Sequence, residues 1–131
     1  MNKLNEKKLF EYAIIRVVPK VEREEFFNVG VILYCKSADY LEAKYYLDPQ
    51  KIELFSCEVD KEILENYWQT WVAICNGEKQ GGAIGEFPTA SRFRWLTATR
   101  STLIQTSKVH PGFCIHPEEK LNQLFEQMVI R

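Results

Sequence analysis

The stretch from Arg23 to Tyr34 includes the most apolar run in the chain, yet Asn28 and Gly30 lie inside it. Both residue types are depleted in β-strands, so each needs a structural or functional reason. The β-branched and aromatic residues around them predict a strand over residues 25–35. Gly30 has two explanations, a β-bulge or a close approach of the backbone to a ligand. Simple alternation assigns one face of this strand to Phe27, Val29, Val31 and Leu33.

Two further strands flank this run. Residues 9–18 are apolar on both faces, which predicts a covered central strand that ends at Pro19. Residues 41–47 alternate apolar and polar side chains, as a half-exposed antiparallel strand does. Because the connections are short, we expect the three strands to form an antiparallel meander.

A helical region follows the meander. Asp48 and Pro49 predict a helix start, since aspartate caps helices and proline is favoured at the first helical position. Asp60 is a second candidate cap, and Asn76-Gly77 a typical stop. We expect the helix between them to cross one face of the sheet and bury both tryptophans. Its apolar stripe, spaced by three and four residues, is Ile63, Leu64, Tyr67, Trp68, Trp71, Val72 and Cys75.

The C-terminal half gives weaker signals. Glycine-rich residues 77–90 predict a loop, and residues 91–99 a short helix capped by Ser91, with a strand as the alternative. Residues 102–107 predict a strand, and residues 109–112, with their proline and glycine, a turn. The final helix begins at Pro117 and has the apolar stripe Leu121, Leu124, Phe125, Met128 and Val129.

These elements predict one fold class. The chain has 131 residues, which suits a single domain over residues 1–131. The expected fold is α+β: a mainly antiparallel sheet, made of a β-meander plus a later strand, packed against two main helices.

Composition narrows the possible partners. The net charge of −1 gives no overall basic field, so nucleic acid is an unlikely partner. Residues 86–110 contain one acid, Glu86, against Arg92, Arg94, Arg100 and Lys108, which could form a modest positive patch. The longest apolar run is too short for a membrane helix, and the N-terminus lacks the apolar region of a signal peptide. We therefore expect a cytoplasmic protein without membrane contact.

The polar residues that look out of place suggest an anion-binding site. Arg16 interrupts an apolar strand, and a buried arginine needs a counter-charge or a hydrogen-bond acceptor. That group could be an internal carboxylate, such as Glu11 or Glu25, or an anionic small molecule held by planar guanidinium groups. The candidate ligand-binding residues are Arg16, Arg23, Asn28, Arg94, Arg100, Gln105 and His110.

Other chemistry has less support. His110, Cys114 and His116 are metal-ligand types, but a fourth ligand at standard spacing is missing. A cysteine nucleophile would need a lowered thiol pKa and a partner base, and the sequence has no nucleophile elbow. The glycines of residues 77–90 lack the phosphate-loop spacing. The four cysteines are far apart and fit free thiols. We therefore expect no catalytic residues, no metal and no cofactor.

Two long motifs resemble the signatures of a bacterial family catalogued as a domain of unknown function, number three-zero-three-seven. The first is Arg16-Val-Val-Pro19 with Arg23-x-Glu25-Phe26-x-Asn28-Val-Gly-Val-Ile-Leu33. The second is Arg92-Phe-Arg-Trp-Leu-Thr-Ala98 with Arg100-Ser-Thr102, Ile104-Gln105, Ser107, Val109-His110, Gly112 and Cys114. Thr99 stands where the resemblance leads us to expect a proline.

The family brings no established activity. The resemblance implies a neighbouring gene for a HipA-like kinase, and hence a protein partner. We therefore expect a non-enzymatic accessory or interaction protein, and keep as the alternative a small enzyme or ligand-binding domain that uses the arginine cluster.

Overall fold

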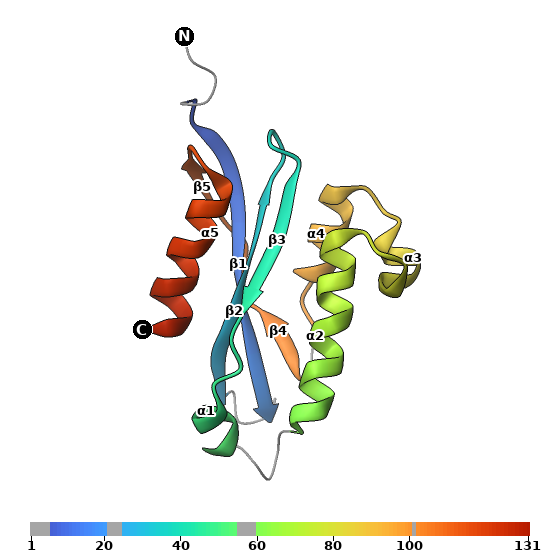
Figure 1. The fold of residues 1–131 in the computed structure, drawn as a ribbon, viewed down its shortest axis with the longest axis vertical. Helices are drawn as coiled ribbons and strands as arrows, with labels where there is room; N and C mark the ends of the chain where they lie inside the picture. The colour runs from blue at the N-terminus through green and yellow to red at the C-terminus, as the bar shows by residue number, and fades with distance from the viewer. Residues whose placement is uncertain (1–5, 21–24, 55–59, 101) are drawn as a thin grey trace.

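The fold is α+β, as the sequence predicts. The computed structural model describes residues 6–20, 25–54, 60–100 and 102–131. Within these residues one antiparallel sheet of five strands carries helices on both faces (Figure 1). The elements are β1 Lys8–Lys20, β2 Glu25–Cys35, β3 Tyr40–Tyr45, α1 Pro49–Leu54, α2 Lys61–Asn76, α3 Gly82–Gly85, α4 Thr89–Leu96, β4 Ile104–Thr106, β5 His110–Cys114 and α5 Pro117–Phe125.

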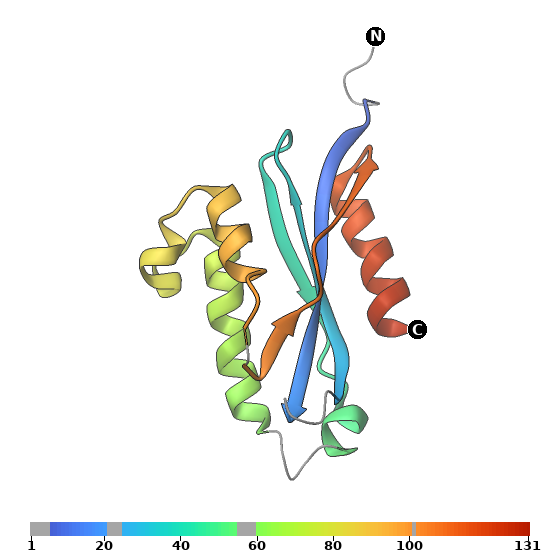
Figure 2. The same cartoon turned by 180° about the vertical axis from the view of Figure 1, so that it is seen from behind.

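The predicted meander is confirmed. The sheet runs β3-β2-β1, and both β4 and β5 then pair with β1. Figure 2 shows these two strands following β1 one after the other, so they form one interrupted edge. Ser107 lies at the interruption: its N–H donates to the Ile14 carbonyl at 2.8 Å, and its Oγ accepts from the Ile14 N–H at 2.8 Å. The edge therefore stays attached to β1 between its two parts.

The turn predicted at residues 109–112 is wrong, because residues 110–112 belong to β5. Proline lacks an N–H but is tolerated in an edge strand where that position faces outward, as Pro111 does. Gly112 is needed for packing: a Cβ there would lie 2.6 Å from the Phe10 ring. The predicted end of β1 at Pro19 is also too early, since the strand continues through a register shift to Lys20.

A bulge in β2 changes the predicted faces. Ile15 pairs with Gly30 and Arg16 with Asn28, so Val29 is an extra residue in β2. Val29 therefore faces the cluster under α2, whereas Val31 and Leu33 face the cluster under α5. The single face predicted for Val29, Val31 and Leu33 is wrong for this reason. A bulge lies beside Gly30 as predicted, and a Cβ on Gly30 would also lie 2.5 Å from the Lys44 carbonyl oxygen, which is a second reason for glycine at this position.

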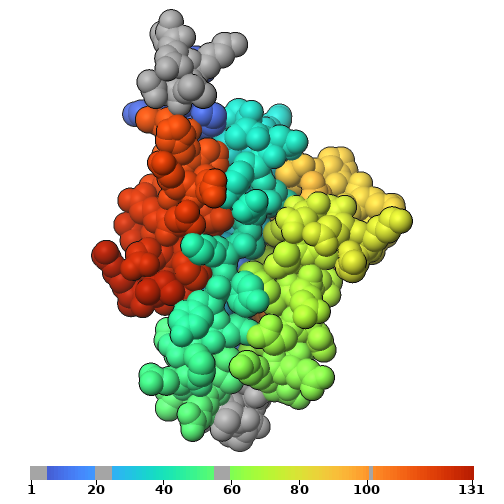
Figure 3. Space-filling view, viewed as in Figure 1, coloured from blue at the N-terminus to red at the C-terminus, as the bar shows by residue number. Residues whose placement is uncertain are grey.

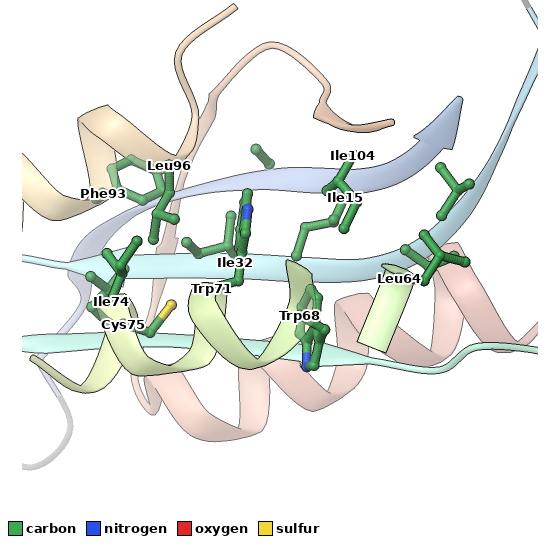
Figure 4. Packing of buried hydrophobic residues seen from close by; sticks show 14 of the residues in the cluster. Ile15, Ile32, Leu64, Trp68, Trp71, Ile74, Cys75, Phe93, Leu96 and Ile104 are labelled. Carbon is green, nitrogen blue, oxygen red and sulfur yellow. The ribbon is translucent and has the colours of Figure 1, made fainter. Parts of the chain in front are cut away.

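The helices bury two apolar clusters, one on each face of the sheet. α2 and α4 cover one face and α5 the other (Figure 1). α2 begins as predicted, where the Asp60 carboxylate accepts the Glu62 N–H at 2.9 Å, and ends at Gly77 in the left-handed conformation. Both tryptophans of α2, Trp68 and Trp71, are buried in the first cluster (Figure 4).

The region after α2 is more helical than predicted. The expected loop over residues 77–90 contains a 3₁₀ turn, Lys79–Gly81, and the short helix α3. The helix expected over residues 91–99 is confirmed as α4, but Ser91 does not cap it. Pro88 precedes the first residue of α4, and proline cannot supply a side-chain cap. The final helix begins at Pro117 as predicted and continues into a π-helical turn, Glu126–Ile130.

Candidate functional site

Three of the predicted site residues form one row across the sheet. In the strand register Arg16 of β1 lies between Gln105 of β4 and Asn28 of β2. Arg16 and Asn28 share the face covered by α5, where the Asn28 amide donates to the Met128 carbonyl at 3.1 Å. The row therefore ends under the π-helical turn that follows α5.

Two polar atoms of this row are unsatisfied. Arg16 Nε and Asn28 Oδ1 are both buried, and neither has a hydrogen-bond partner among the described residues. The Arg16 guanidinium lies over the Phe26 ring, 4.3 Å from its centroid, as in a cation–π contact. An unmade hydrogen bond on a buried group costs about 1–3 kcal/mol. The row thus contains one buried donor and one buried acceptor without a partner among the described residues.

A hollow of about 240 Å³ adjoins Asn28. Among the described residues that line it, Lys51 and Arg131 are cationic and Asp48 is anionic. This size suits a small anion such as phosphate better than a nucleotide. Asn28 is the residue of the row that lines this hollow, and Lys51 and Arg131 were not among the predicted site residues.

Arg94 lies on the other face of the sheet, on α4. Its guanidinium holds the Glu11 carboxylate of β1 through hydrogen bonds of 2.5 and 2.8 Å. The bond to Glu11 is the main cause that raises the pKa of Arg94. Glu11, one of the two carboxylates considered for Arg16, is therefore engaged with a different arginine.

The remaining predicted residues do not join the row either. Arg100 lies over the Trp95 ring, 4.0 Å from its centroid, and donates to the Trp95 carbonyl. His110 of β5 stacks beside Tyr12, with ring centroids 5.4 Å apart. Arg23 lies outside the described residues. The structure thus brings together Arg16, Asn28 and Gln105, and it separates Arg94, Arg100 and His110 from them.

Arg92, which was not among the predicted site residues, has the most extensive contacts of this basic segment. Its Nη1 donates to the carbonyls of Ile74 at 2.9 Å and Cys75 at 2.7 Å, at the C-terminal end of α2. Nε and Nη2 donate to the Phe87 carbonyl and the Thr89 hydroxyl. The charge complements the negative end of the helix dipole. Arg92 is therefore a structural cap rather than part of a free positive patch.

The thiols are poorly suited to nucleophilic chemistry. Cys35, Cys75 and Cys114 are buried and free, and Cys57 lies outside the described residues. Burial raises the pKa of Cys75 to about 12, and that of Cys114 is also raised, mainly by burial. Within the described ranges, no three His, Cys, Asp or Glu side chains gather closely enough to hold a metal ion.

A second candidate site is a groove between β3 and α2, which the sequence did not suggest. A hollow of about 700 Å³ has Tyr45 and Trp68 in its wall, and one of about 200 Å³ has Glu42 and Ala43. Val72 lines both, so the two hollows adjoin at this residue. Figure 3 shows β3 and α2 meeting along a seam on the surface. We call this feature the β3–α2 groove.

The indole of Trp68 is the unusual group in this wall. The side chain is 2% exposed, and its Nε1 has no hydrogen-bond partner among the residues described. Figure 4 shows the ring nitrogen on the side toward β3. The Tyr45 ring covers the indole, with centroids 4.0 Å apart. The groove therefore contains an aromatic pair and a buried donor that lacks an acceptor.

The same geometry lies within a region matched by a known family. The model of the family described as Protein of unknown function (DUF3037) matches residues 12–129. The chain belongs to DUF3037. Within this DUF3037 match lie the row of Arg16, Asn28 and Gln105 and the β3–α2 groove. Comparisons with curated proteins and with solved structures found no match. In the part of the chain described, no helix is long and apolar enough to span a bilayer.

Proposed function

We propose that this DUF3037 protein is a non-enzymatic interaction protein that binds another protein through the β3–α2 groove. The observation that carries the proposal is the groove itself: it runs beside a strand that, among the described residues, pairs on one side only. An edge strand with a neighbouring helix is a recurring site for protein segments. The high pKa of Cys75, which lines the groove, supports a binding role over a nucleophilic one.

Co-purification tests the interaction role. The chain carries an affinity tag and is isolated from its native host, with mild cross-linking and mass spectrometry. We expect one protein in near-stoichiometric amount. The HipA-like kinase implied by the family resemblance is the first candidate to be assayed directly with both purified proteins. Recovery of the chain as a lone monomer contradicts the proposal.

A second candidate function is binding of a small anion by the row of Arg16 and Asn28. The buried Arg16 Nε, a donor on a cationic group without a partner among the described residues, favours it. Inorganic phosphate, nucleotides and phosphosugars are compared in thermal unfolding. A ligand at a hundredfold excess over Kd stabilises by about 2.7 kcal/mol. The Arg16→Met variant should lose this stabilisation and Arg94→Met should keep it. No shift with any of these anions contradicts this function.

A further inference from the structure

The outer edge of β3, on which no strand pairs among the described residues, presents backbone groups in a pattern that an added strand can use. The Tyr46 N–H donates to the Val29 carbonyl at 2.7 Å, so this residue faces β2. The Lys44 carbonyl also points to β2, since a Cβ on Gly30 would lie 2.5 Å from it. In antiparallel pairing alternate residues face opposite sides. Ala43 and Tyr45 therefore direct their N–H and C=O groups away from the sheet.

The opposite edge of the sheet is less able to accept a strand. Pro111 of β5 has no N–H to offer there, and β4 spans three residues, Ile104–Thr106. Proline and short strands are ways in which proteins prevent pairing at an edge. The β3 edge contains no proline. Of the two edges, β3 is the one suited to pairing.

The groove would also receive the side chains of an added strand. In strand addition, backbone bonds to the edge provide affinity, and pockets for alternate side chains provide specificity. Ala43 and Tyr45 belong to the face on which α2 packs, and the small Ala43 leaves space beside Val72. The two hollows lie one after the other along β3, as alternate side chains of an extended chain do.

The charge of the groove indicates the kind of partner. Among the described residues that line the two hollows, the charged ones are Glu42 and Glu78. The Glu42 side chain alternates with Ala43 and lies on the α5 face near Tyr40, so Glu78 is the carboxylate on the side of the groove. Glu65 is close enough to Tyr45 to raise its pKa, together with the larger effect of burial. Amide side chains, such as Asn66 and Gln69, complete the polar rim. An incoming segment with lysine or arginine would complement these carboxylates.

We propose that the β3–α2 groove binds an extended, basic segment of a partner protein as an additional strand on β3. This inference rests on the proposed interaction role and specifies how the partner binds. The segment forms backbone hydrogen bonds with Ala43 and Tyr45, places one apolar side chain beside Val72 and directs a basic side chain to Glu78. Its carbonyls are candidate acceptors for the buried Trp68 N–H once the Tyr45 ring moves aside.

Random 12-residue peptides displayed on phage provide a defined probe. Panning on the full chain should enrich sequences that alternate apolar residues with lysine or arginine.

Synthetic versions of these peptides should bind the wild-type chain in fluorescence polarisation. Ala43→Pro should raise Kd at least tenfold, because it removes an outward N–H and leaves the pairing with β2 intact. Phe113→Pro makes the same change at the β5 edge and should leave Kd unchanged. Circular dichroism and thermal unfolding verify that both variants fold.

Two further measurements test whether the segment binds as an added strand if Ala43→Pro proves unstable. Hydrogen exchange of the wild-type chain should show new protection at the amides of Ala43 and Tyr45 when peptide binds. Glu78→Lys should weaken binding at least fivefold, whereas Glu119→Lys on α5 should not. The distance of Glu119 from the groove and its exposed position make it a matched control.

Several outcomes would overturn the inference. These are peptides that bind Ala43→Pro as tightly as the wild type, enrichment of acidic or helical sequences, or no enrichment at all. Light scattering that shows a dimer with protected Ala43 and Tyr45 amides would assign the edge to a second copy instead. A native partner that still co-purifies with Ala43→Pro would reject the strand mode and leave the interaction role standing.

Discussion

Arg94 and Glu11 form a two-pronged ion pair that joins helix α4 to strand β1 across 83 positions of sequence. Planar guanidinium and carboxylate groups fit each other in this arrangement. The anion that Arg94 holds is thus part of the protein, and this separates Arg94 from the anion-binding role predicted for it. The Arg94 side chain is 57% exposed and that of Glu11 24%, so water weakens the pair.

Because the pair is exposed, we expect it to contribute little to the free energy of unfolding. A double-mutant cycle with Glu11→Gln and Arg94→Gln should give a coupling of about 0.5–1 kcal/mol in urea unfolding. The coupling should fall when the salt concentration is raised, because the pair is open to solvent. A coupling above about 2 kcal/mol would show that the pair is buried in solution and would contradict this geometry.

Arg92 should matter more than Arg94. Its guanidinium donates four hydrogen bonds, two of them to the last carbonyls of α2. We expect Arg92→Ala to lower the free energy of unfolding by about 2–3 kcal/mol, measured by urea titration. Arg92→Lys should recover less than half, since an ammonium cannot bond all four acceptors at once.

The matched control is Arg94→Ala, two residues further along α4. It should cost at most about 1 kcal/mol, because the side chain is largely exposed. Equal losses for the two alanine variants would show that Arg92 does not cap α2.

Local signals predicted much of this fold. Asp60 and Gly77 delimit α2 in the structure because capping depends on groups within a few residues of each other. The strand predicted over residues 25–35 matches β2 at both ends. These features depend on side chains that lie close to one another in the sequence.

The errors have non-local causes. The glycine of β5, Gly112, is required by the Phe10 ring of another strand, and no nearby residue reveals that contact. The bulge at Val29 reverses the alternation of β2, so faces counted from the sequence are correct only up to that residue. For the candidate site, residue type pointed to Arg16 and Arg94 alike. The two arginines nevertheless lie on opposite faces of the sheet. Arg16 and Glu11 point to opposite sides of β1, and Arg94 binds Glu11.

Gly30 should tolerate no side chain. A Cβ there would lie 2.5 Å from the Lys44 carbonyl oxygen, a backbone atom that cannot move without disturbing β3. We expect Gly30→Ala to destabilise by about 1–3 kcal/mol, as overpacking does, in the same urea titration. It should also weaken peptide binding at the β3 edge. A neutral effect on stability would mean that β2 and β3 are farther apart in solution.

Cys75 should make folding stability depend on alkaline pH. Burial raises the pKa of this thiol from 9.0 to about 12. The folded state therefore holds the proton more tightly than the unfolded state. The resulting stabilisation is complete below pH 9 and is lost as pH rises toward 12, at no more than about 1.4 kcal/mol per pH unit for one proton. Urea titrations at pH 7–10.5 measure the slope.

Other buried groups titrate in the same range, so the comparison with a variant isolates this thiol. The pKa values of Tyr40 and Cys114 are also raised, mainly by burial. Cys75→Ala will be less stable at pH 7 because it leaves a small cavity. Its stability should nevertheless fall less steeply above pH 9 than that of the wild type.

The folded wild type should also resist iodoacetamide at Cys75 at pH 9, because little thiolate is present. Parallel pH profiles for the two chains, or rapid alkylation at Cys75, would show that the thiol is accessible to water, and the wall of the groove would then be open at this position.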